Sequence, residues 1–115
     1  MDEKYYAHLS EDGRKQTVLA HLLCTALLCA QFAAKFGEKA LGYWAGLLHD
    51  IGKFAKAFQK RLFDSGKKVD HSTAGAWESK AYLPISLCIM GHHSGLPDLG
   101  GRTDKGKPTY FGRMN

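Results

Sequence analysis

The hydrophobic positions of the chain follow helical spacing up to about residue 94. The longest apolar stretch predicts a helix over residues 18–36, with Thr17 placed to cap it and Gly37 placed to end it. Polar residues interrupt this stretch, and it falls short of the ~20 apolar residues that a membrane span needs. We therefore expect a buried helix of a protein that has no membrane span.

Four further helices are predicted after the first. Leu41, Trp44, Ala45 and Leu48 form the i, i+3, i+4, i+7 stripe of an amphipathic helix over residues 38–49. The remaining three helices are expected over residues 54–63, 71–82 and 84–92.

The composition changes at Gly95. Glycines and prolines recur from there to the end without a periodic apolar pattern, which predicts a surface loop or frayed tail over residues 95–115. No run of alternating apolar residues is long enough to predict a sheet. The fold class that we expect is all-α, a compact helical bundle forming one domain over residues 1–115.

Composition and charge narrow the class of protein. With 44% hydrophobic and 23% charged residues, the chain resembles an ordinary folded domain. The formal net charge of +5 suits a polyanionic partner, and basic residues concentrate in residues 53–68 and 102–113. A solvated surface explains these basic stretches equally well. The three cysteines form no CxxC pair, and we expect reduced thiols in the core of a cytoplasmic protein.

Five of the six histidines, with one aspartate, are spread over four predicted helices. These candidate metal ligands are His21, His49, Asp50, His71, His92 and His93. Imidazole binds iron, cobalt, nickel, copper and zinc, and a carboxylate extends the range to manganese and magnesium. In helical bundles, inward side chains on facing helices build metal sites. A lone histidine on an apolar face is more often a hydrogen-bonded core residue, so these residues support a metal site only as a set.

Asp50 and Lys53 are the candidate catalytic residues. Adjacent helical residues point about 100° apart, so His49 and Asp50 share an ion only at a helix end or with the carboxylate between two ions. A bridging Asp50 would hold two cations at the ~3.5–4 Å that supports two-metal phosphoester hydrolysis. On a continuing helix, Lys53 lies on the same side and would hold a substrate phosphate. The alternative is a solvated lysine at the start of a helix.

The motifs around these residues occur in a characteristic order. LLHDIGK at residues 47–53 looks like the signature of the HD phosphohydrolase superfamily. Together with His21, the FQ pair at 58–59, DHSTAG at 70–75 and GHHSGLPD at 91–98, it resembles one particular family. That family is the N-terminal HD nuclease domain of the CRISPR-associated nuclease-helicase of type I interference systems.

The resemblance covers about residues 5–100 and implies a helical domain that holds two divalent metal ions and cuts single-stranded DNA. Carried over by position, one ion is bound by His21, His49 and a bridging Asp50, the other is bound by His71, His92 and His93, and Lys53 lies beside the scissile phosphate. Histidine-rich ligation favours iron, cobalt, nickel or manganese over magnesium.

The resemblance also implies partners and exposes one departure. The family domain is joined to a superfamily 2 helicase in the same full-length protein, and a guide-RNA surveillance complex recruits it. The family pattern has a further aspartate well beyond the histidine pair, and this chain ends before it, at Asn115. We therefore expect a fragment with weakened metal binding at the His21 side, low activity, and apolar surface that promotes self-association.

Two other functions stay open. The chain could be an HD phosphohydrolase acting on nucleotides, against which the DHSTAG and GHHSG segments count. It could also be a non-catalytic HD scaffold that binds nucleic acid or a partner protein, which the missing aspartate favours.

Overall fold

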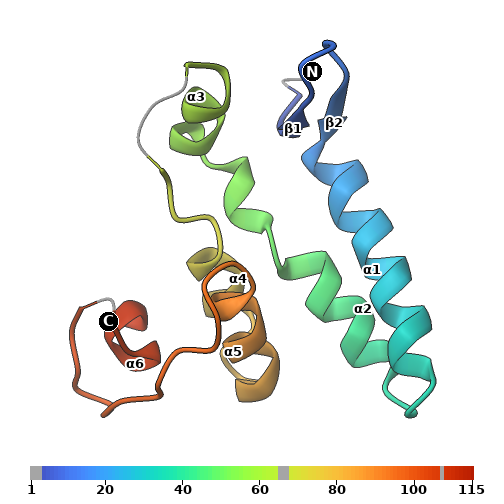
Figure 1. Cartoon of the computed structure of the whole chain (residues 1–115). Coiled ribbons are helices and arrows are strands. Elements are labelled where there is room, and N and C mark those ends of the chain that lie inside the picture. Colours follow the sequence, from blue (N-terminus) through green and yellow to red (C-terminus); the bar gives the residue numbers. More distant parts are fainter. Residues whose placement is uncertain (1–3, 65–67, 107) are drawn as a thin grey trace.

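The computed structural model describes residues 4–64, 68–106 and 108–115. Within these residues, six α-helices, one 3₁₀ helix and a two-stranded hairpin form a helical domain (Figure 1). The elements are β1 (Tyr6–Leu9), β2 (Lys15–Thr17), α1 (Val18–Ala34), α2 (Lys39–Leu48), the 3₁₀ helix η1 (Ile51–Phe54), α3 (Lys56–Asp64), α4 (Thr73–Glu78), α5 (Leu83–Gly91) and α6 (Tyr110–Met114). The predicted helical fold class is confirmed, and the ends of the predicted helices differ from the observed ones by up to four residues.

Helices α1 and α2 pack side by side along their lengths (Figure 1). Thr17 caps α1, because its hydroxyl oxygen accepts a hydrogen bond from the backbone nitrogen of Ala20 at 3.1 Å. Gly37 takes a positive φ of 80° just beyond the end of α1. Gly46 lets the two backbones approach closely, since a Cβ there would lie 2.7 Å from the Cα of Ala26.

The face of α1 that turns away from α2 is apolar and exposed. Leu19, Leu27 and Phe32 are 60–63% exposed, so the expectation of a buried helix holds for one face only. Cys24 on the same helix is also exposed, which contradicts the expectation of core thiols. Among the described residues, none of the helices combines the length and the apolar character needed to cross a membrane.

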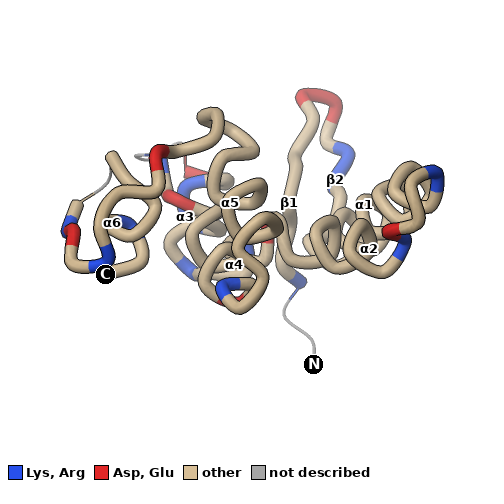
Figure 2. Tube along the Cα trace, turned by 90° about the horizontal axis from the view of Figure 1, so that it is seen from below, with Lys and Arg blue, Asp and Glu red and all other residues tan. Residues whose placement is uncertain are grey.

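Charged residues lie mainly away from α1, which carries no Lys, Arg, Asp or Glu (Figure 2). The basic stretch predicted around α3 exposes Lys56 and Lys60 but leaves Arg61 partly buried. Lys67 and Lys107, which also belong to the predicted basic stretches, lie outside the described residues.

The antiparallel hairpin of β1 and β2 corrects the expectation that the chain forms no sheet. Its strands have four and three residues, which is too short for an alternating pattern to show. Ala7 is 2% exposed and packs with Val18 and Leu22. Gln59 of α3 holds the hairpin, because its side chain donates to the carbonyl oxygen of Tyr6 at 2.9 Å and accepts from the Tyr6 nitrogen at 3.0 Å.

The C-terminal segment also differs from the expected loop or frayed tail, because it ends in α6. Tyr110 is 3% exposed and packs with Ala76, Ile89 and Met90. Its hydroxyl lies 2.7 Å from the Ser86 hydroxyl, so α6 is fixed to α5 by a buried hydrogen bond. A five-residue helix that follows many glycines carries too little periodicity to be predicted.

Close backbone contacts join η1 and α2 to the segment around α4. A Cβ at Gly52 would lie 2.5 Å from the carbonyl oxygen of His71 and 2.7 Å from its Cα. A Cβ at Gly75 would collide with the carbonyl oxygen of Leu48. These two glycines therefore hold the Asp50 region against the His71 region.

Replacing Gly52 tests this contact. We expect Gly52→Ala to lower the free energy of unfolding by about 1–3 kcal/mol, because the added methyl group overpacks against the His71 backbone. Gly101→Ala is the matched control, since its Cβ would meet nothing closer than 3.4 Å. Urea unfolding of both variants measures the difference, and equal stabilities would contradict the close contact.

Candidate metal centre

The Asp50 carboxylate lies at the centre of a group of histidines. Asp50 follows the end of α2, precedes η1 and is 3% exposed. His21 comes from α1, His49 from the C-terminal end of α2, and His92 from the C-terminal end of α5. His71 was predicted to begin a helix, but it lies in the segment before α4.

One oxygen of Asp50 faces His21 and His49. The Oδ2 atom lies 2.9 Å from Nε2 of His21 and 3.2 Å from Nε2 of His49, and those two nitrogens lie 3.1 Å apart. These three residues form a group whose candidate ligand atoms all lie within 4.8 Å of one another.

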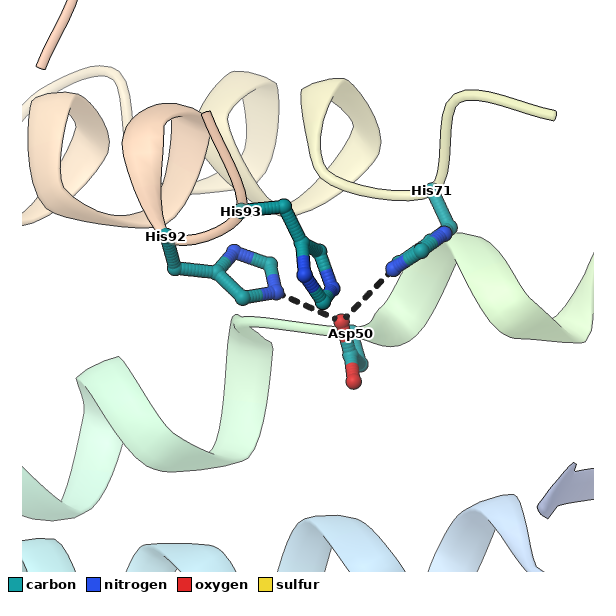
Figure 3. Close-up of side chains that lie close together, drawn as sticks. All are labelled: Asp50, His71, His92 and His93. Carbon is teal, nitrogen blue, oxygen red and sulfur yellow. Dashed lines mark hydrogen bonds and ion pairs between the residues drawn. The ribbon is translucent and has the colours of Figure 1, made fainter. Parts of the chain in front are cut away.

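The other oxygen of Asp50 faces the second group of histidines (Figure 3). The Oδ1 atom lies 2.9 Å from Nε2 of His92 and 3.4 Å from Nε2 of His71. The centroid of the His93 ring lies 4.2 Å from that of the His92 ring, with the two planes tilted, and 4.7 Å from that of the His71 ring, in an edge-on arrangement. The structure thus brings all six candidate ligands together in two groups that share Asp50.

Backbone carbonyl groups orient the imidazole rings. Nδ1 of His49 lies 2.6 Å from the carbonyl oxygen of Gly46, and Nδ1 of His92 lies 2.6 Å from that of Ile89. A carbonyl oxygen accepts only, so Nδ1 carries the proton in each ring and donates it. The Nε2 atoms of both rings, which face Asp50, are therefore free to act as ligands.

This donor set fits a divalent cation. With Nδ1 protonated, the Nε2 lone pairs of His49 and His92 face carboxylate oxygens, which requires a proton or a metal ion between the two acceptors. Nε2 of His71 is buried and has no hydrogen-bond partner among the described residues. Because an unpaired buried nitrogen costs free energy, both features favour cations within the centre.

The electrostatics of the centre are set by burial and by Asp50. Burial lowers the pKa of His21 and of His71 below the ordinary histidine value of 6.5. The hydrogen bond to Asp50 instead raises the pKa of His92. Burial alone would raise the pKa of Asp50, but in the absence of a cation the hydrogen bonds with His49 and His92, each with a proton between Nε2 and the carboxylate, outweigh burial and hold that pKa below its ordinary range. At neutral pH the centre therefore presents an ionised carboxylate to the surrounding imidazoles.

Lys53 is buried beside the same carboxylate, which contradicts the alternative of a solvated lysine. It is 5% exposed, and its Nζ lies 3.4 Å from Oδ2 of Asp50. The Nζ also donates to the carbonyl oxygen of Ala7 at 3.3 Å and lies 5.3 Å from the centroid of the Phe58 ring. The turn that carries Lys53 is a 3₁₀ helix, not a continuation of α2.

Sequence reasoning gave no role to two residues that support the centre. The His8 ring lies 4.9 Å from the His21 ring, because β1 runs beside α1. Gln59 donates to the Lys53 carbonyl oxygen at 2.7 Å as well as to the hairpin. The polar N-terminal segment carried no signal for His8, whereas the FQ pair of the ordered motifs already included Gln59.

The pKa directions predict how metal binding depends on pH. We expect the affinity for Mn²⁺ to fall as the pH is lowered from 8 to 5, because protons compete for the imidazole nitrogens, beginning at His92, whose pKa is raised above the ordinary histidine value. Burial of His21 and His71 delays their protonation to lower pH. Calorimetric titration of the protein with Mn²⁺ at several pH values measures this profile. An affinity that stays constant down to pH 5 would rule out imidazole ligation.

Comparison with known proteins places this centre in a family context. The chain is 36% identical over 86 residues to ribonuclease Y of Syntrophobacter fumaroxidans, a match that covers 71% of this chain and 15% of that protein. It is 40% identical over 84 residues to ribonuclease Y of Mycoplasma capricolum subsp. capricolum, covering 68% of this chain and 14% of that protein. The matched region is therefore a small part of these relatives.

These relatives are ribonucleases Y, so they do not support the narrower resemblance to a CRISPR-associated nuclease-helicase. What the comparisons do support is the superfamily. Residues 18–105 match the HD domain, and this range includes His21, Asp50 and His93. The chain belongs to the HD domain family, the group of metal-dependent phosphohydrolases expected from its HDIGK segment.

Proposed function

We propose that this domain is a metal-dependent phosphodiesterase that hydrolyses single-stranded nucleic acid. The observation that carries the proposal is the position of Asp50, whose two carboxylate oxygens face two separate groups of histidines. A carboxylate placed in this way suits a bridging role between two cations, which is the arrangement used for phosphoester hydrolysis.

The proposal assigns a role to each residue of the centre. The proposed ligands are His21, His49 and Asp50 for one ion and Asp50, His71, His92 and His93 for the other. Iron, cobalt, nickel or manganese suits this histidine-rich set better than magnesium. When bound, two such cations activate a water molecule and offset the charge that develops on the phosphate oxygens. Lys53 adds a fixed positive charge beside Asp50, close to where the scissile phosphate would lie.

Two observations bear on the kind of nucleic acid. The DHSTAG and GHHSG segments resemble those of nucleases that cut single-stranded DNA. The relatives named above are ribonucleases, which supports RNA. If the substrate is DNA, we propose two partners: a helicase domain of the same full-length protein and a guide-RNA surveillance complex.

A nucleotide phosphohydrolase is the second candidate. Membership of the HD domain family and the histidine-aspartate centre support it as well as they support a nuclease. In that case the substrate would be a mononucleotide, and no contact beyond the metal centre would be needed.

Removing the shared aspartate and its neighbour tests the proposal. We expect the wild-type chain with Mn²⁺, Co²⁺ or Ni²⁺ to cleave a single-stranded oligonucleotide, and the His49→Ala/Asp50→Ala variant to be slower by about 100-fold or more, because it loses bound cations worth several kcal/mol in the transition state. Asp98→Asn is the matched control, since Asp98 lies outside both ligand groups. Gel assays with labelled DNA and RNA measure the rates.

The outcome separates the candidate functions. Cleavage of DNA or of RNA supports the nuclease and selects its substrate. Turnover of mononucleotides alone would favour the second candidate. Oligonucleotide binding with no turnover would favour a non-catalytic scaffold, and cleavage that survives in the double variant would contradict the assigned metal ligands.

A further inference from the structure

A cavity of about 560 Å³ adjoins the metal centre on its His71 and His93 side. It is lined by residues of α3, by residues 68–72 before α4, by the residue that follows the C-cap of α5, and by α6. Its polar lining residues include Arg61, Lys68, Asp70, His71, His93 and Arg113. The cavity therefore contains three basic side chains beside two of the candidate metal ligands.

Two of these cations have no counter-charge among the described residues. Nε of Arg61 is buried and has no hydrogen-bond partner there. Lys68 is exposed and forms no ion pair with any residue of the described ranges. Arg61 is only partly buried and lines the cavity, so an acceptor that enters the cavity can approach its guanidinium group.

The carboxylate among these lining residues is already paired. The Asp70 Oδ2 atom accepts from Arg113 at 3.2 Å, and its Oδ1 atom accepts from the backbone nitrogens of Ser72 and Thr73 at 3.0 Å each. Arg113 is further held by the Thr73 hydroxyl at 2.8 Å. The negative charge of Asp70 thus offsets the positive charge of Arg113. The positive charges of Arg61 and Lys68 remain available to an anionic ligand.

We propose that this cavity binds a backbone phosphate next to the scissile one, through Arg61 and Lys68. The inference rests on the proposed function and deepens it, because it makes the substrate a strand and not a mononucleotide. With the scissile phosphate at the Asp50 centre, a phosphate bound in the adjoining cavity would be a second phosphate of the same nucleic-acid strand. A guanidinium binds phosphate through paired N–H donors, and a lysine adds a point charge.

Binding without catalysis tests the inference independently of the proposed function. The probe is a fluorescent single-stranded oligonucleotide, titrated with the full chain in EDTA and followed by anisotropy over a series of salt concentrations. We expect Arg61→Gln and Lys68→Gln each to weaken binding about fivefold to tenfold at 50 mM salt, and to reduce the slope of log K against log salt by about 0.7, as expected for one lost phosphate contact. Lys60→Gln is the matched control, because Lys60 is exposed on the same helix and does not line the cavity.

A second measurement distinguishes the adjacent phosphate from the scissile one. The turnover of bis(p-nitrophenyl) phosphate, which has a single phosphate, should fall much less in Lys68→Gln than the turnover of the oligonucleotide. An equal loss of turnover with this substrate and with the oligonucleotide would place Lys68 at the scissile phosphate and overturn the inference. Wild-type affinity and salt slope in both cavity variants would also overturn the inference. If circular dichroism shows that Arg61→Gln is unfolded, the result for Lys68→Gln alone decides. Absence of any metal-dependent turnover would count against the proposed function and leave the binding test intact.

Discussion

A buried, ionised carboxylate that has to be neutralised is the constraint on which this structure depends. Asp50 is 3% exposed, and Lys53 is the permanent positive charge closest to it among its described contacts. Moving a charge out of water is expensive unless opposite charges and hydrogen bonds surround it. The imidazole nitrogens around Asp50 supply either protons or cation ligands, and their carbonyl-bound Nδ1 atoms favour the second role.

The fold serves this centre by bringing distant segments into backbone contact. Gly46 joins α2 to α1, and Gly52 joins η1 to the His71 backbone, so that residues from four segments reach one carboxylate. The hairpin covers the Lys53 side of the centre, with Gln59 hydrogen-bonded to both Tyr6 and Lys53. On the other side, α6 carries Arg113 to the cavity that adjoins His71 and His93.

The helical class could be predicted from the sequence, and so could the six residues that lie together around Asp50, because helical periodicity and the HDIGK, DHSTAG and GHHSG segments are local features. That these residues bind metal ions stays a prediction. It was not sufficient for features that depend on contacts between distant residues. The hairpin and α6 are too short to show a period, and Tyr110 becomes a core residue only through its contacts with Ile89 and Met90. Lys53 was placed beside Asp50 by spacing, but its burial depends on Ala7 and Phe58. Gly42 and Gly46 weaken α2 as an isolated helix and are explained only by the packing of α1 against them.

The most direct test of the shared carboxylate is the number of cations that the chain holds. Equilibrium dialysis against Mn²⁺ at pH 7.5 followed by elemental analysis should give two ions per wild-type chain and fewer than one in Asp50→Asn. The amide keeps the shape of the side chain but lacks the charge that both ions share. A wild-type chain without bound ions, or an Asp50→Asn chain that still holds two, would contradict the account.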